Sequence, residues 1–312
     1  MSMSLLFPPT TVHRYQKLMQ YCEETAFGVS QSSMSFTDAS VINSTKTTSE
    51  NATETYRKLG KRQLYKLIKM GVMFPWSCSF SPVDTALIRY GTENGNSAGT
   101  LTGTLDKSLT FVNSIFANTP GSAGPLVEHF VLRKGSKCDS ITITTTSKGM
   151  VQVDMDWLSS SITQVTTANG GLTTPTFVAS PTTATPWSNL TGGVSKLSLN
   201  SIIYPFKSAS VTVNNNLDPV DVDGNDLIQY LEPTVKETTF TCEVIVLKDL
   251  AIETAISAGT SLPLVLTLNS TGPKTLTGNW FPTKKEESDA SDETKVRTYT
   301  FSGQLDDVTC SA

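Results

Sequence analysis

Two short stretches of the chain alternate between apolar and polar residues. They are Trp76-Ser77-Cys78-Ser79-Phe80 and Phe240-Thr241-Cys242-Glu243-Val244. Alternation of this kind is typical of a β-strand that packs one face on a hydrophobic core. A short helical pattern follows each stretch, with an aspartate near its start and a glycine at its end, namely Asp84 to Gly91 and Asp249 to Gly259. These residue types are common helix caps, so we expect a strand and then a short helix in each half.

Further strand-like stretches follow both helical patterns. They are rich in threonine and valine, which favour pleated, half-buried surfaces over helices. In order along the chain, the expected strands cover residues 108–113, 130–133, 140–146, 150–158, 261–269, 274–281 and 294–305. The sequence therefore predicts a mainly β fold with two tandem β-sandwich or barrel modules, each with a flanking short α-helix.

The two halves also resemble each other at an offset of roughly 164 residues, which indicates an internal repeat. Positions of similar character correspond without a gap, with Gly60, Leu64, Leu67, Trp76, Cys78 and Phe80 opposite Gly224, Ile228, Leu231, Phe240, Cys242 and Val244. Upstream, residues 38–43 resemble residues 208–214. A chain of 312 residues is long enough for two domains of common size.

The join between the halves is rich in threonine, proline and glycine. We expect a first module with an N-terminal arm over residues 1–165, a linker over 166–195 and a second module over 196–312. Such a composition is typical of a flexible linker. Phe177 and Trp187 point the other way, because large apolar side chains favour a segment that packs over a surface, of this chain or of a neighbouring subunit.

Charge and cysteine content narrow the classes of function. A net charge of −4 is unfavourable for tight binding to a nucleic-acid backbone. The five cysteines are far apart in the sequence, which predicts buried free thiols rather than a disulfide framework or a metal site. We find no signal-peptide pattern and no apolar stretch of about 18 residues, so we expect a protein that is used without translocation and has no membrane partner.

Residues for catalysis or metal binding are scarce. The two histidines, His13 and His129, are near no nucleophile motif, so we expect no enzyme activity and no cofactor. Asp218, Asp221, Asp223 and Asp226 around Gly224 resemble a calcium loop, but Pro219 and the absence of a glutamate at the twelfth position break that pattern. A solvated acidic loop explains them better.

A second acidic run separates the last two expected strands. It contains Glu286, Glu287, Asp289, Asp292 and Glu293. Most runs of this type are exposed hairpin tips. The alternative is that these carboxylates line a pore or face a partner.

Residues 21–29, Tyr-Cys-Glu-Glu-Thr-Ala-Phe-Gly-Val, resemble the opening of tail tube proteins of tailed viruses, where an E-x-T-x-[FY]-G-V segment precedes the first strand. Residues 210–217, Ser-Val-Thr-Val-Asn-Asn-Asn-Leu, look like a later strand of the same family. The resemblance implies a β-sandwich with a flanking helix whose strands join across subunits into a barrel. It implies six-fold rings that stack into a tube.

The resemblance further implies a structural protein of the virion tail, assembled in the host cytoplasm. Its partners would be other copies of itself and the tail terminator, tail tip and tape measure proteins. DNA would pass through an acidic lumen without specific binding. Because the module is duplicated, we expect three chains in a pseudo-six-fold ring, with a homohexamer as the alternative.

The loops after the paired Ser-Val strands differ in charge between the halves. The first carries Arg57, Lys58, Lys61 and Arg62, and the second carries Asp218, Asp221, Asp223 and Asp226. Our hypothesis is that these loops reach into the next ring and that their opposite charges fix the stacking register. The alternative is two unrelated solvated loops.

Two other classes of function remain open from the sequence. A secreted or surface β-rich adhesin is compatible with tandem threonine-rich modules, although it needs an export signal. A carbohydrate-binding protein or glycosidase is the other, because Trp76, Trp157, Trp187 and Trp280 could stack on sugars. Their positions mostly on strands favour packing in a core instead.

Overall fold

The structure is a computed structural model. It describes residues 14–29, 37–38, 41–47, 50–57, 64–92, 107–118, 126–165, 185–188, 197–220, 230–245, 251–269, 274–287 and 298–310. Strands account for most of these residues, and two helices are short, which confirms the prediction of a mainly β fold. Within these ranges, no helix is long and apolar enough to cross a membrane.

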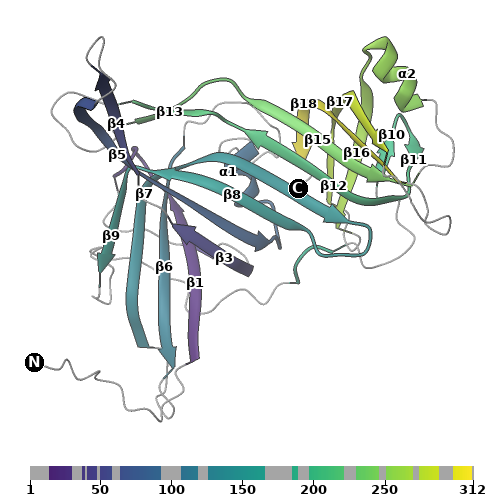
Figure 1. Ribbon diagram of the computed structural model, residues 1–312. Coiled ribbons are helices and arrows are strands. Elements are labelled where there is room, and N and C mark those ends of the chain that lie inside the picture. Colours follow the sequence, from purple (N-terminus) through teal and green to yellow (C-terminus); the bar gives the residue numbers. More distant parts are fainter. Residues whose placement is uncertain are drawn as a thin grey trace, which may run out of the picture.

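Each half contributes a series of strands and one helix (Figure 1). The first half contains β1 (Arg14–Glu23), β2 (Thr37–Asp38), β3 (Val41–Thr47), β4 (Glu50–Arg57), β5 (Leu64–Ser81), α1 (Ile88–Thr92), β6 (Leu109–Asn118), β7 (Leu126–Thr146), β8 (Gln152–Ser159) and β9 (Ser161–Val165). The second contains β10 (Leu197–Leu199), β11 (Ile202–Ile203), β12 (Phe206–Asn214), β13 (Leu217–Val220), β14 (Tyr230–Pro233), β15 (Glu237–Val244), α2 (Ala251–Ala258), β16 (Leu262–Asn269), β17 (Lys274–Glu287) and β18 (Tyr299–Cys310).

The strands of the two halves follow the same order. The first half runs β3-β5-β8-β7-β6-β1-β2, and the second runs β12-β15-β18-β17-β16-β10-β11, with antiparallel pairing throughout. β12 also pairs with β7, with Asn214 opposite Ser140 and Ser208 opposite Thr146. One continuous sheet therefore passes from the first half into the second (Figure 1).

The register of the pairing repeats as well as the strand order. Thr45 lies opposite Cys78 and Ala209 opposite Cys242, so both partners carry numbers 164 higher in the second half. The same shift relates the pair Glu50 and Met73 to Asn214 and Glu237. The β3–β5 pair and the β12–β15 pair also contain a register shift at equivalent places, after Ile42 and after Phe206.

One alignment made from the sequence alone differs from this register. Residues 38–43 resemble residues 208–214, yet the structure places Ile42 in the position of Phe206. The Ser-Val dipeptides that the two stretches share therefore do not occupy equivalent positions in the fold. Pairing with β5 and β15 decides which residues correspond, and these partners lie 23 to 40 residues downstream, beyond the reach of a local match.

Each helix follows a strand of the sheet, α1 after β5 and α2 after β15, and each buries one of its faces. Ile88 of α1 and Ile252 of α2 are both buried. Asp84 Oδ1 accepts a hydrogen bond from the Ala86 backbone N–H at 2.9 Å, as expected of a residue that caps the turn. Gly259 follows α2 with a φ of 63°, the left-handed conformation common after helices.

Gly91 does not terminate α1, which continues to Thr92. Its role is close packing, because a Cβ at this position would lie 2.9 Å from two side-chain carbon atoms of Ile141. In the sequence, a glycine that is needed for close packing cannot be distinguished from a glycine that caps a helix.

Aromatic side chains fill the core in both halves. Trp76 and Trp157 stack with ring centroids 5.8 Å apart, and Phe111 meets both edge-on. In the second half, Phe240 packs edge-on against Trp280 at 5.3 Å. These tryptophans and Trp187 are buried, which confirms core packing rather than an exposed sugar platform.

Within the linker, the structure describes residues 185–188. The Trp187 backbone N–H donates to the Pro82 carbonyl at 2.8 Å, and its indole N–H donates to the Val83 carbonyl at 2.9 Å. The next residue, Ser188, donates its backbone N–H to Asn269 of the second half. This part of the linker therefore packs on its own chain, whereas Phe177 lies outside the described residues.

The described cysteine side chains are free thiols, and Cys78, Cys138 and Cys242 are buried as expected, whereas Cys22 is half-buried. Burial raises the pKa of Cys78 and of Cys242 to about 12. It also raises the pKa of Cys138 well above its usual value. These thiols stay protonated at neutral pH and act as small apolar groups in the core.

Candidate functional site

A polar face extends across six neighbouring strands of both halves. Alternate residues of β5, β8, β7, β12, β15 and β18 point away from the core, and all are half-buried or exposed. We call these residues the polar face: Ser77, Ser79, Gln152, Asp154, Asp156, Ser140, Thr142, Thr144, Ser208, Ser210, Thr212, Thr239, Thr241, Glu243, Thr300, Ser302 and Gln304. Hydroxyl groups dominate it, and the next alternate residues of β5 and β8, Pro75 and Leu158, are apolar and half-buried.

Hydrogen bonds link neighbouring strands across the polar face. Thr142 and Thr212 hydroxyls meet at 3.0 Å across the seam between β7 and β12. The Ser140 hydroxyl donates to Asp156 at 2.8 Å. These contacts leave a surface of short side chains with few flexible groups.

The charge of the polar face is mainly negative. Asp154, Asp156 and Glu243 contribute carboxylates. Beside the face, Lys207 donates a 3.0 Å hydrogen bond to Glu243, which holds the pKa of Glu243 below its usual value. The two aspartates therefore give the surface a negative potential that repels phosphate groups.

The sheet has an open edge on each half. Among the described strands, β3 pairs with β5 alone and leaves its other edge uncovered. In the second half, β16 covers β17 from Lys274 to Trp280, and the segment from Phe281 to Glu287 pairs only with β18. An open strand edge exposes unpaired backbone groups and is a template for pairing with another chain.

At the seam, a hairpin of the second half covers the first half. β13 and β14 pair with each other, and Leu231 is buried against Phe27, Met73 and Leu158. Lys137 is buried beneath them, and its ammonium donates to the Leu231 carbonyl at 3.0 Å.

The ammonium of Lys137 also lies over two aromatic rings. It is 4.2 Å from the ring centroid of Tyr230 and 5.8 Å from that of Phe27. A buried cation is costly unless polar and aromatic partners replace its water. These contacts fix the hairpin to the seam.

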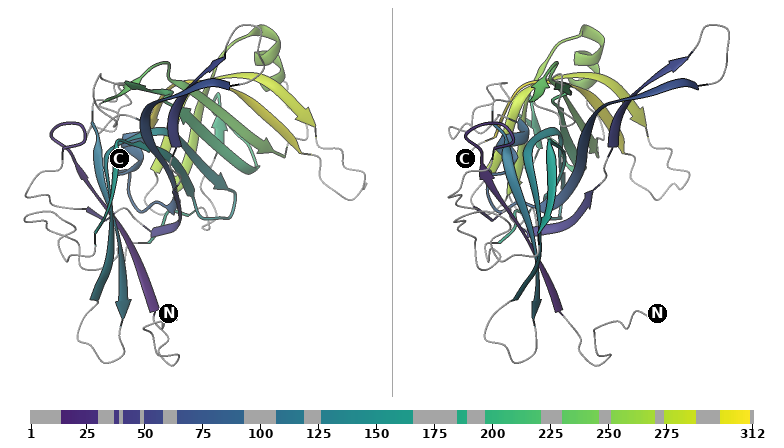
Figure 2. Two further views of the ribbon diagram at one scale, coloured as in Figure 1. Left: turned by 60° about the vertical axis from the view of Figure 1, so that its left-hand side comes forward. Right: turned by 90° about the vertical axis from the view of Figure 1, so that its left-hand side faces the viewer.

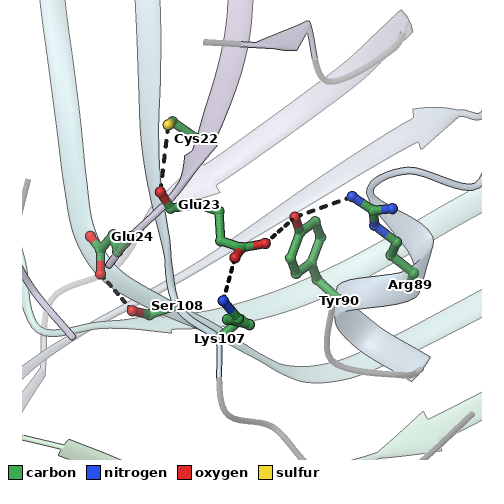
Figure 3. A network of polar contacts seen from close by, with 7 residues as sticks. All are labelled: Cys22, Glu23, Glu24, Arg89, Tyr90, Lys107 and Ser108. Carbon is green, nitrogen blue, oxygen red and sulfur yellow. Dashed lines mark hydrogen bonds and ion pairs between the residues drawn. The ribbon is translucent and has the colours of Figure 1, made fainter. Parts of the chain in front are cut away.

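Glu24 lies in the segment that carries the sequence motif, and its carboxylate is buried. It accepts hydrogen bonds from the hydroxyls of Ser108 and Thr110, both at 2.6 Å. The backbone N–H groups of Gly28 and Gly135 complete the set at 2.9 Å each. Glu24, the residue between the glutamate and the threonine of the motif, therefore connects the end of β1 to β6 and β7. Figure 3 shows its hydrogen bond with Ser108.

The neighbouring Glu23 points the other way and binds near the surface. Lys107 forms an ion pair with it at 2.6 Å, and the Tyr90 hydroxyl donates to it at 3.1 Å (Figure 3). Arg89 donates in turn to the Tyr90 oxygen at 3.4 Å. Burial raises the pKa of Tyr90, which therefore stays protonated at neutral pH.

The basic and acidic loop residues expected from the sequence lie mostly outside the described residues. Arg57 is the last residue of β4, and Asp218 is an exposed residue of β13. β4 and the β5 segment that pairs with it form a hairpin, drawn in dark blue in Figure 2, that projects from the rest of the chain. Outside the described residues lie Lys58, Lys61, Arg62, Asp221, Asp223 and Asp226.

The acidic run begins at the end of β17. Glu286 and Glu287 are exposed there, and Asp289, Asp292 and Glu293 lie outside the described residues. Glu286 forms an ion pair with Lys284, and Lys285 pairs with Glu253 of α2. Among the residues that the structure describes, no group of three or more acidic, histidine or cysteine side chains is arranged to hold a metal ion.

Sequence reasoning missed Lys137, Phe281 and the open edges. Lys137 follows a serine in a polar stretch, where nothing marks it as buried. Phe281 was expected at the end of a strand, yet it is 38% exposed. The motif around Glu24 was the available signal for its network, although three of the four donors, all except Gly28, follow 84 or more residues later.

A family model described as phage tail tube protein matches residues 15–305, nearly the whole chain. The match defines the protein as a structural component of the virion tail. The chain belongs to the phage tail tube protein family, as the resemblance of residues 21–29 and 210–217 indicated. No curated protein matches the chain.

Proposed function

We propose that the protein self-assembles into closed rings that stack into a tail tube, and that the tube is the channel for genome delivery. The observation that carries this proposal is the pair of open edges, β3 on the first half and outer β17 on the second. The edges belong to different surfaces of the chain, so each subunit can pair with the next in a head-to-tail manner. Such contacts generate a ring when the rotation closes.

The ring would contain three chains. Each chain holds two units with the same strand order and the same register, and one such unit would occupy each place in a six-fold ring. The boundaries proposed for these units are residues 1–165 and 196–312, joined by residues 166–195. A homohexamer would instead place twelve units in the ring.

The polar face would line the channel. Its hydroxyl groups offer no apolar surface to bases, and Asp154 and Asp156 repel the phosphates of DNA. Passage therefore needs neither specific binding nor a catalytic residue. Function of this kind is passive, and the protein would act from the virion tail after assembly in the host cytoplasm with tail terminator, tail tip and tape measure proteins.

Electron microscopy of the purified protein tests this proposal. We expect rings or tubes with an open centre. Dispersed single particles at all concentrations, with no assembly after addition of preformed tail tips, would contradict it and favour an adhesin or a carbohydrate-binding protein.

The charged loops would fix how rings stack. The β4–β5 hairpin and the β13–β14 hairpin correspond to each other in the repeat, and the charged clusters at their loops, around Gly60 and around Gly224, have opposite signs. Reversing the charge at Arg57 and Lys61 is expected to abolish tube elongation and to leave single rings. Sedimentation of the tubes, with microscopy of the supernatant, measures both. A variant that forms tubes of normal length would reject the stacking role.

A further inference from the structure

The seam between the halves consists of two contacts. In the first, β12 pairs with β7 along the polar face, with Asn214 opposite Ser140. In the second, the β13–β14 hairpin covers Lys137 and packs Leu231 on the first half. Both contacts join one unit of the repeat to the next unit.

We propose that this seam is an internal copy of the contact between subunits, and that it fixes the register in which a second copy of this chain binds. The edge formed by β3 and the start of β4 would pair with outer β17 of the neighbouring chain. This inference rests on the proposed assembly into rings. It adds which residues face each other across the subunit boundary.

The equivalent of β12 follows from the shared register. Six of the eight pairs between β12 and β15 have a described counterpart 164 residues earlier, and one of them relates Asn214 to Glu50. The β4–β5 hairpin corresponds in the same way to the β13–β14 hairpin, because Leu67 pairs with Thr55 as Leu231 pairs with Pro219.

The equivalent of β7 follows from two observations. Cys78 lies opposite Met155 and Cys242 opposite Phe301, so β8 corresponds to β18. β7 and β17 each contain a register shift beside these strands, between Cys138 and Ser140 and between Pro282 and Lys284. Ser140 therefore corresponds to Lys284, and Lys137 corresponds to Phe281.

Transfer of the seam to the subunit boundary brings opposite charges together. Glu50 of one chain takes the position directly opposite Lys284 of the next chain. Lys46, four pairs further along, would take a register position diagonal to that of Glu286 on β17. Cross-strand pairs of opposite charge are favourable at direct positions, and diagonal neighbours about 7 to 8 Å apart are still within reach of long side chains.

The same transfer explains an exposed aromatic side chain. Phe281 is 38% exposed, while Lys137 at the equivalent position is buried beneath Tyr230 and Leu231. The β4–β5 hairpin of the neighbouring chain would cover Phe281, with Leu67 in the position of Leu231. At the subunit boundary, Phe281 of one chain would therefore contact Leu67 of the next. This apolar contact takes the place that Lys137 and its aromatic partners have at the seam.

Charge exchange tests the register. Lys284→Glu or Glu50→Lys alone places like charges opposite each other at every boundary of the ring, and we expect the protein concentration needed for ring assembly to rise by about tenfold. The double variant, Glu50→Lys with Lys284→Glu, is expected to restore assembly. Lys274→Glu, at the other end of β17, is the matched control and should assemble normally.

Two further variants test the hairpin contact. Phe281→Ser is expected to weaken assembly, whereas Val265→Ser, at a similarly exposed apolar position on β16, is not. Thermal unfolding of the unassembled subunits shows whether each variant folds. Equal assembly by the Phe281 and Val265 variants would overturn this part of the proposal.

Cross-linking separates the register from ring formation itself. In a chain with Cys22→Ser and Cys310→Ser, Glu50→Cys with Lys284→Cys is expected to form disulfides between chains. Glu50→Cys with Ser288→Cys, shifted by four residues, is not. Rings in which the shifted pair forms the cross-link would overturn the register and leave the tube function intact. A double charge variant that fails to restore assembly would do the same. Absence of rings from the unaltered protein would overturn both.

Discussion

Glu24→Ala is expected to lower the free energy of unfolding by about 3 to 4 kcal/mol, because it leaves several buried donors without an acceptor. The donors are the Ser108 and Thr110 hydroxyls and two backbone N–H groups, and both hydroxyl residues are buried. Loss of their shared acceptor also frees the segment after β1 from β6 and β7. Chemical denaturation of the unassembled subunit measures the change.

The neighbouring glutamate provides a matched control. Glu23 binds Lys107 near the surface, where both side chains keep more than a third of their exposure. Ion pairs of this kind contribute at most about 1 kcal/mol. Glu23→Ala should therefore cost much less than Glu24→Ala, and equal losses would show that the buried network does not hold these strands together.

Gly303→Ala is expected to destabilise the second half by about 3 kcal/mol and to prevent ring assembly. A Cβ at this position would lie 2.0 Å from the Phe281 carbonyl oxygen and 2.7 Å from the Pro282 Cα. Both are backbone atoms of the neighbouring strand, so the strands must separate. The displaced segment is the start of outer β17, which is the proposed pairing edge. Denaturation and the ring count by microscopy give the two readouts.

Gly259→Ala is the control for this substitution. Gly259 adopts a φ of 63°, but no atom lies within 4 Å of the position of its Cβ. The cost is therefore conformational and amounts to about 1 kcal/mol, with normal ring assembly. A Gly303 variant that behaves like the Gly259 variant would contradict the close approach of β17 and β18.

Local patterns predicted the elements whose cause is local. Alternation in residues 76–80 and 240–244 reflects strands with one buried face, and the structure confirms both strands and their alternating burial. Where two stretches, 130–133 and 140–146, were expected, one strand runs through as β7. Gly135, with a φ of 60°, interrupts the pattern without ending the strand.

The features that carry the proposed function depend on contacts that no local pattern records. Glu24 receives hydrogen bonds from residues up to 111 positions away, and Lys137 binds a carbonyl 94 positions away. The repeat offset of about 164 residues was visible in the apolar core positions. The alignment of β3 with its counterpart was not visible in the sequence. Pairing with β5 decides that alignment, and a short Ser-Val match does not.

The central claim is that two units of one chain occupy neighbouring places in a ring and repeat their seam at each subunit boundary. The mass of isolated rings, measured by native mass spectrometry or by the symmetry of averaged images, tests it most directly. The expected ring has three times the mass of the 33.6 kDa chain and six similar units around its axis. A ring of six chains would contradict the claim.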